Sequence, residues 1–131
     1  TAIADWNGKA STAAQIAAST SSAVTNTASY APGWCNLYSR ANKNGYGLTA
    51  GKWWLPSVGE MMMIYANMTK VNYALSLISG ATQLQENWYW TSTENGASYA
   101  WHLYLSDGTL NFWNDKASNS GRVRAVSAFI G

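Results

Sequence analysis

Several residue types that support particular functions are scarce in this chain of 131 residues. Cys35 is its only cysteine, so no disulfide can form within the chain. His102 is its only histidine, which leaves little material for a histidine-based zinc site or a Ser-His-Asp triad. Charged residues make up 11% of the chain, and they form no basic stripe of the kind that binds nucleic acid. We therefore expect no catalytic residue, no metal, no cofactor and no nucleic-acid partner.

Long apolar runs, internal repeats and linker-like stretches are absent as well. Without an apolar run of about 20 residues, we expect no membrane insertion by this domain. A length of 131 residues suits one domain with a real core, so we expect a single unit over 1–131. Cys35, next to Trp34, is expected to be a small buried hydrophobe rather than a nucleophile.

Tryptophan and tyrosine are abundant instead, with eight of each against two phenylalanines. Both side chains carry a polar group that needs a partner or solvent, so a core alone does not favour them over phenylalanine. Their excess is typical of a protein with a large amphipathic recognition surface.

Helix signals are short and separated by loops. Ser11 is a candidate N-cap for a helix over 11–18, and Asn72 for a second helix over 73–79 that ends at Gly80. A short helix is also expected within 30–40, and loops over 42–51 and 114–121. Ser57 and Glu60 match a capping box after the extended segment 53–56. The helix that follows places an apolar stripe on one side, made of Met61, Ile64, Tyr65 and Met68.

From Trp88 onward the pattern is that of strands and turns, closing with a strand over 122–130. Asp107-Gly108 predicts a two-residue type I′ turn, which pairs Leu105 with Leu110 and Leu103 with Phe112. This register places the apolar side chains on one face and a mixed polar and aromatic set on an exposed face. We expect one apolar layer to form the core, comprising Trp53, Leu55, Trp90, Trp101, Leu103, Leu105 and Phe112.

Three motifs stand in order along the chain: Trp-Leu-Pro-Ser-Val-Gly-Glu at 54–60, Tyr-Trp-Thr-Ser-Thr-Glu at 89–94, and Arg-Val-Arg-Ala-Val at 122–126. With the stretch 7–16 and Ala100-Trp101, this set resembles a family of C-type-lectin-like domains from bacteria and phages. Met61 stands where leucine is usual in that family, and Thr91 where serine is. The resemblance implies an α+β fold with two main helices packed on a small twisted antiparallel sheet with long loops.

Within that family, the chain most resembles the variable proteins of diversity-generating retroelements. Their last third carries ligand-contacting positions that are rewritten by adenine-directed mutagenesis. An AAC codon altered only at its adenines can encode His102, Tyr104, Ser106, Thr109 and Asn111, but not Trp113. The resemblance implies a ligand-binding domain, in some cases part of a longer chain, on a bacterial cell surface or a phage particle. Its partner would be a protein or glycan on a cell surface.

The predicted ligand-binding residues combine the polar and aromatic face of the hairpin with flanking aromatic and amide side chains. They are Tyr89, Tyr99, His102, Tyr104, Ser106, Thr109, Asn111, Trp113 and Asn114. Large rigid rings in this set supply contact area, and the small polar groups supply adaptable hydrogen bonds.

Two other functions remain open from the sequence. Trp113-Asn114-Asp115 matches the calcium-binding tripeptide of sugar-binding C-type lectins, with Glu94-Asn95 at about the distance of their Glu-Pro-Asn motif. The proline of that motif is missing here, and with it the cis turn that aims the carbonyl groups. Alternatively, the aromatic face packs beneath another domain of a larger surface or tail protein.

Overall fold

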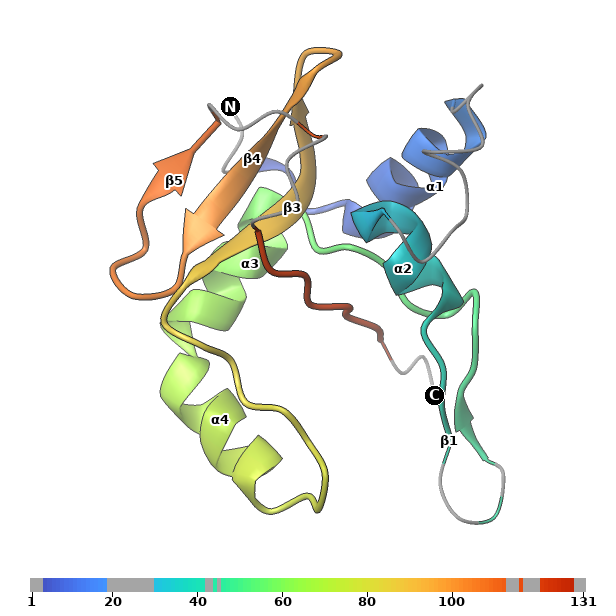
Figure 1. Cartoon of the computed structure of the whole chain (residues 1–131), viewed down its shortest axis with the longest axis vertical. Helices are drawn as coiled ribbons and strands as arrows, with labels where there is room; N and C mark the ends of the chain where they lie inside the picture. Colours follow the sequence, from blue (N-terminus) through green and yellow to red (C-terminus); the bar gives the residue numbers. More distant parts are fainter. Residues whose placement is uncertain are drawn as a thin grey trace.

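The computed structural model describes residues 4–18, 30–41, 44, 46–112, 116 and 121–128. Within them the chain forms a mixed α+β structure with four helices and two small antiparallel sheets (Figure 1). The helices are α1 (Gly8–Ala18), α2 (Ala31–Leu37), α3 (Val58–Ala66) and α4 (Met68–Ser76). The strands are β1 (Arg40–Ala41), β2 (Gly47–Leu48), β3 (Trp88–Asn95), β4 (Tyr99–Tyr104) and β5 (Leu110–Asn111).

Strand β3 anchors the larger sheet, whose order is β3-β4-β5. Its first half pairs with the end of β4, with Tyr89 opposite Leu103 and Trp90 opposite His102. At its other edge, the backbone of Arg122 exchanges hydrogen bonds with β3, at 2.9 Å to the Trp90 N–H and 3.1 Å to the Trp88 carbonyl. Six consecutive residues of β3, from Trp88 to Thr93, are buried, because both faces of the strand are covered.

One face of the sheet packs against α3, as Figure 1 shows. Met61 of α3 is fully buried there, together with Leu84, Tyr89, Leu103 and Leu105. Ile64 and Tyr65 of the predicted stripe pack around this cluster, and so does Met68, which is the first residue of α4 because α3 ends at Ala66. The apolar stripe predicted for this helix is therefore confirmed for Met61, Ile64 and Tyr65, whereas Met68 belongs to the next helix.

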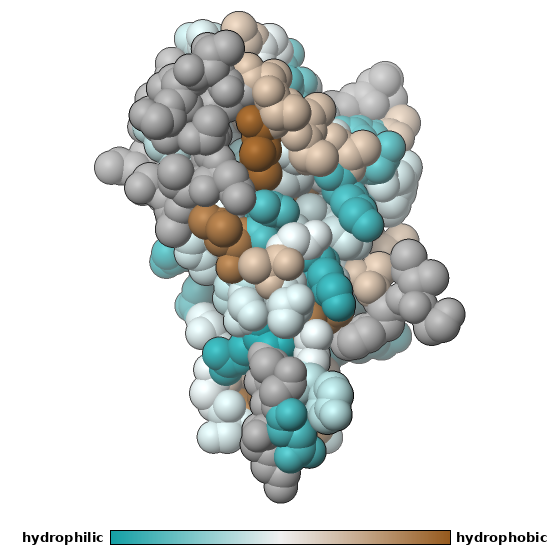
Figure 2. Space-filling view, turned by 90° about the vertical axis from the view of Figure 1, so that its right-hand side faces the viewer, coloured by the Kyte–Doolittle hydropathy of each residue, from teal (hydrophilic) through white to brown (hydrophobic). Residues whose placement is uncertain are grey.

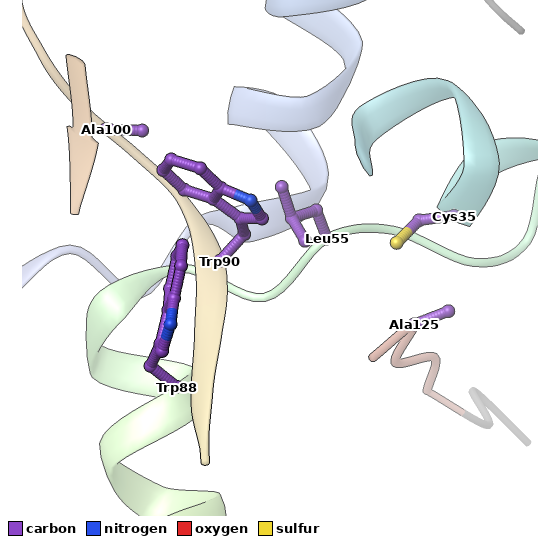
Figure 3. Close-up of a cluster of buried hydrophobic side chains, with 6 residues drawn as sticks. All are labelled: Cys35, Leu55, Trp88, Trp90, Ala100 and Ala125. Carbon is purple, nitrogen blue, oxygen red and sulfur yellow. The ribbon is translucent and has the colours of Figure 1, made fainter. Parts of the chain in front are cut away.

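The opposite face packs against α2 and the segment 121–128. Trp88 and Trp90 lie side by side along β3, with ring centroids 5.2 Å apart. Figure 3 shows the Trp90 indole between Ala100 and Leu55, with Cys35 and Ala125 farther toward α2 and the last segment. Cys35 is fully buried, as predicted, and burial raises the pKa of its thiol.

The motif residues at 57–60 and 91–94 hold these elements together. Ser57 and Glu60 form the predicted capping box, with the Glu60 carboxylate 2.8 Å from the Ser57 N–H. The Thr93 hydroxyl donates to Asp5 at 2.8 Å and accepts from the Val58 N–H at 2.9 Å. These contacts tie the start of the chain, the start of α3 and the middle of β3 into one hydrogen-bonded unit.

Several predicted boundaries are wrong. Helix α1 begins at Gly8, so Ser11 lies inside it and is not an N-cap. Asn72 lies inside α4, where its side-chain amide bonds the backbone N–H and carbonyl of Leu84 at 2.7 and 3.0 Å. The predicted loop 42–51 contains β2, which pairs with β1. Among residues 121–128, the predicted closing strand is reduced to isolated bridges at Arg122 and Val126.

The predicted single apolar layer is also wrong, since the core is divided between the two faces of the sheet. Leu55, Trp90, Leu103 and Leu105 are buried as predicted, but in two separate clusters. Trp53 is half-buried against Tyr38, at 4.9 Å between ring centroids. Trp101 is half-buried and its ring packs at a tilt against that of Phe112, which is 38% exposed. Among the described residues, no helix combines the length and the apolar character that a membrane span requires.

A pair of leucine substitutions tests this division of the core. Leu103→Ala should lower the free energy of unfolding by about 2–5 kcal/mol, because it leaves a cavity between the sheet and α3. Leu77→Ala, at a side chain that is 70% exposed, should change it by less than about 0.5 kcal/mol. Urea denaturation of the two variants measures both values, and equal losses would contradict the packing described.

Candidate recognition surface

The connection between β4 and β5 is a five-residue turn, 105–109, rather than the predicted two-residue loop. Leu103 pairs with Leu110 and His102 with Asn111, which shifts the register by two residues from the prediction. A type I′ turn needs positive φ at both central residues, and here only Gly108 has it, at 78°. The shift is even, so the assignment of side chains to the two faces of the hairpin is kept.

The turn is held by contacts on three sides. The Leu105 side chain is buried in the α3-side cluster, and its N–H donates to the Asn87 carbonyl at 2.8 Å. The Gly108 N–H donates to the Tyr104 carbonyl at 2.8 Å, and its Cα lies close to the Tyr65 ring. The Asp107 carboxylate accepts from the Thr109 N–H at 2.9 Å, and this hydrogen bond lowers the pKa of Asp107.

Around this turn the structure brings together four of the predicted ligand-binding residues. Tyr104 is 36% exposed, Ser106 and Thr109 are exposed, and Asn111 is half-buried. The Tyr104 N–H donates to the Thr109 carbonyl at 2.9 Å, which continues the β4–β5 ladder into the turn. We refer to these four residues, Tyr104, Ser106, Thr109 and Asn111, as the recognition surface.

Two predicted site residues are buried instead, and their placement corrects the prediction. Tyr89 belongs to the core on the α3 side, and its hydroxyl accepts from the Gln85 N–H at 2.9 Å. His102 was expected on an exposed strand face, but only 2% of it is accessible. The hairpin face was assigned correctly, but Trp88 and Trp90 of the neighbouring strand cover it.

His102 lies in an aromatic enclosure. Its ring centroid is 4.5 Å from that of Trp88, 5.9 Å from that of Trp90 and 6.0 Å from that of Tyr104. Its Nδ1 atom is buried without a hydrogen-bond partner among the described residues. Burial disfavours the charged imidazolium and lowers the pKa of His102. His102 therefore packs beside the Tyr104 ring as a buried residue, and it does not lie exposed on the hairpin as predicted.

Tyr99 is exposed, but it lies apart from the recognition surface. Side chains alternate along β4, so Tyr99 and Tyr104 project from opposite faces of the sheet. Tyr99 shares its face with Trp101 and Phe112, whose rings are in contact. Trp113 and Asn114, the last two predicted site residues, lie outside the described residues.

The candidate calcium ligand Glu94 is engaged with a lysine. Lys116 Nζ lies 2.6 Å from the Glu94 carboxylate and 3.2 Å from the Gly96 carbonyl. Asn95, next in β3, is opposite Tyr99 in the ladder. Within the described ranges, no three or more His, Cys, Asp or Glu side chains are grouped as metal ligands. Glu94 is thus one half of a surface ion pair in this structure.

Three residues that shape the surface were not predicted as part of it, namely Tyr65, Asn87 and Leu105. Tyr65 and Leu105 were expected only to pack in the core, but both also position the turn. Asn87 directly precedes Trp88, the first residue of β3, and carries no local signal for its role. Its carbonyl accepts from the Leu105 N–H, and this role follows only from the position of β4 beside β3 in the folded chain.

Stability between pH 5 and 7.5 tests the burial of His102. The usual pKa of 6.5 applies to the unfolded chain, and the folded-state pKa is lower, so the unfolded chain binds more protons. The free energy of unfolding should therefore be level above pH 7.5 and fall as the pH decreases through 6.5. For one proton, the slope cannot exceed about 1.4 kcal/mol per pH unit.

Urea denaturation across this pH range, on the natural chain and on His102→Gln, separates this effect from other titrations. Because the chain has no other histidine, the variant should show a nearly flat profile over the same range. Equal slopes for the two proteins would show that His102 is accessible to solvent.

Comparison with known proteins gives no relative for this chain. No family model matches it, and neither a curated protein nor a solved structure is significantly similar to it.

Proposed function

We propose that this domain is a recognition module that binds a macromolecular ligand through the recognition surface. The observation that carries the proposal is the alternation of anchored and displayed side chains between 102 and 109. His102, Leu103 and Leu105 are buried on the two sides of the sheet. Tyr104 lies between Leu103 and Leu105 in the sequence, Ser106 and Thr109 follow Leu105, and all three face solvent.

This arrangement favours binding because little conformational entropy is lost when the ligand arrives. The backbone that carries Tyr104 and Thr109 is already fixed by hydrogen bonds to Asn87 and within the turn. A tyrosine adds a large rigid contact area with few rotatable bonds, and the neighbouring hydroxyl and amide groups adapt to the ligand. Binding surfaces of this composition are typical of protein and glycan recognition.

The finer proposal is a C-type-lectin-like ligand-binding domain of a diversity-generating retroelement variable protein, on a bacterial surface or phage particle. Its support is the resemblance of the ordered motifs at 54–60, 89–94 and 122–126. The motif residues Ser57, Glu60 and Thr93 hold the scaffold, whereas the displayed residues lie outside those motifs. Such a division allows the surface to vary while the fold is kept.

Nucleotide sequence around the natural gene tests the retroelement proposal separately. A near-copy of the coding region for the last third, differing only at adenines and accompanied by a reverse transcriptase gene, would support it. If the flanking sequence contains neither the near-copy nor the reverse transcriptase gene, the retroelement proposal is wrong. The proposal of a recognition module would not be affected.

A randomised library tests the recognition module itself. Positions 104, 106, 109 and 111 should accept varied residues while the melting temperature stays within a few degrees, because their neighbours hold the fold. Selection against an unrelated soluble protein should then yield binders. A control library randomised at exposed positions 69, 70, 73 and 77, on and just after α4, should yield far fewer. General unfolding of the first library, or equal yields from the two, would contradict the proposal.

Ligand binding by this surface should not require calcium. The Glu94 carboxylate is paired with Lys116, and Glu94-Asn95 lacks the intervening proline, and with it the cis turn, of the Glu-Pro-Asn motif in calcium-dependent lectins. Isothermal titration with calcium should show no stoichiometric site, and a chelator should leave the affinity of a selected binder unchanged. A site that is lost in Glu94→Gln but kept in Glu86→Gln would favour the lectin function instead.

A further inference from the structure

A second candidate site lies on the other side of the molecule, among α1, β2 and the segment 51–54. A groove of about 510 Å³ opens there, bordered by Lys9, Gly47, Leu48, Gly51, Lys52 and Trp54. In Figure 1, α1, α2 and β1 lie on the right, away from β4 and β5 on the left. Figure 2 views the molecule from this right-hand side and shows hydrophilic atoms interspersed with apolar ones.

The wall formed by Trp54 is fixed by the scaffold on both sides. Its backbone exchanges two hydrogen bonds of 2.9 Å with Val126, and the Ser127 hydroxyl donates to the Lys52 carbonyl at 2.6 Å. Thr12 of α1 bonds the backbone of Leu55 through its hydroxyl, at 3.0 and 3.2 Å. The groove is therefore shaped before any ligand arrives.

Docking of α1 also places a cation on the tryptophan. Gly8 packs so closely on Glu60 and the Leu55 carbonyl that a Cβ atom there would collide with them. The first turn of α1 is thereby held over the segment, and Lys9 Nζ lies 5.8 Å from the Trp54 ring centroid. Lys52 borders the same groove from the 51–52 turn.

The groove carries positive charge from two lysines that line it, Lys9 and Lys52. Neither Lys9 nor Lys52 is in an ion pair in the part of the chain described, where Lys116–Glu94 is the pair that forms. The Glu60 carboxylate lies beside Trp54, where its Oε2 accepts from the Ser57 N–H at 2.8 Å and the Trp54 indole N–H at 3.4 Å. The Glu60 carboxylate is thus engaged in the capping box. The ammonium groups of Lys9 and Lys52 remain available to bind an anion.

We propose that this groove binds an acidic sugar, with its carboxylate at Lys9 and Lys52 and its ring against Trp54. Lys9, Gly47, Gly51 and Lys52 are exposed, so one side of any ligand here stays in water. A sugar ring suits that geometry because its C–H face is apolar while its hydroxyl edge remains hydrated. The volume is sufficient for one or two sugar residues. This site is independent of the recognition surface.

Two matched probes test the proposal on the full chain, namely methyl β-glucuronide and methyl β-glucoside, which differ only in the carboxylate. In NMR titrations, the glucuronide should shift the Trp54 indole N–H and the amides of Gly47, Gly51 and Lys52. The glucoside should bind at least fivefold more weakly. Lys9→Gln and Lys52→Gln should each weaken glucuronide binding at least fivefold, while Lys70→Gln on α4 should change it less than twofold.

Three results would overturn the proposal. Equal affinity for the glucoside would show that the two lysines do not select the ligand. Shifts centred on Tyr104 and Thr109 would place the sugar on the recognition surface instead. Equal affinity for a triaspartate peptide, lost in the same lysine variants, would make the groove an acidic-peptide site. Unchanged amide spectra of the lysine variants without ligand confirm that the fold is intact in each comparison.

Discussion

Strand β3 is covered on both faces from Trp88 to Thr93, and the surrounding elements take their places from this double burial. Tyr89 faces α3, while Trp88 and Trp90 face α2 and the segment 121–128. Burying one large apolar side chain stabilises a fold by about 1.5–3 kcal/mol, so these rings together dominate the packing. Gly121 packs against both tryptophan rings because it has no side chain, and a Cβ atom at this position would collide with them.

The placement of β4 beside this strand determines which residues reach solvent. Leu103 and Leu105 enter the cluster on the α3 side, and His102 is enclosed by the two tryptophans. Tyr104 lies at the end of β4, where this cover stops, and the turn beyond it is fixed through Leu105 and Tyr65. Buried and exposed side chains thus alternate near the end of β4. The buried ones fix the backbone that presents the exposed ones to a ligand in the proposed function.

Two local signals in the sequence predicted the structure around α3 correctly, whereas the N-cap signals at Ser11 and Asn72 did not mark helix starts. The capping box at Ser57 and Glu60 and the apolar stripe of α3 depend on neighbouring residues, and both are confirmed.

The errors arose where distant segments compete with a local preference. Asp107-Gly108 favours a tight turn, but the burial of Leu105 and its bond to Asn87 lengthen the connection and shift the register by two residues. His102 was placed on the correct hairpin face, yet a hairpin pattern contains no information on Trp88 and Trp90. Four of the predicted site residues do meet on one surface, because an even shift of register preserves the faces.

Native-state hydrogen exchange tests most directly whether the displayed residues stand on a rigid frame. The amides of Tyr104, Leu105 and Gly108 donate to the carbonyls of Thr109, Asn87 and Tyr104. If the frame is rigid, these three amides should exchange nearly as slowly as that of Trp90 in the buried part of β3. Exchange as fast as that of the exposed residue Thr82 would show that the turn opens independently of the core, and would contradict a preformed recognition surface.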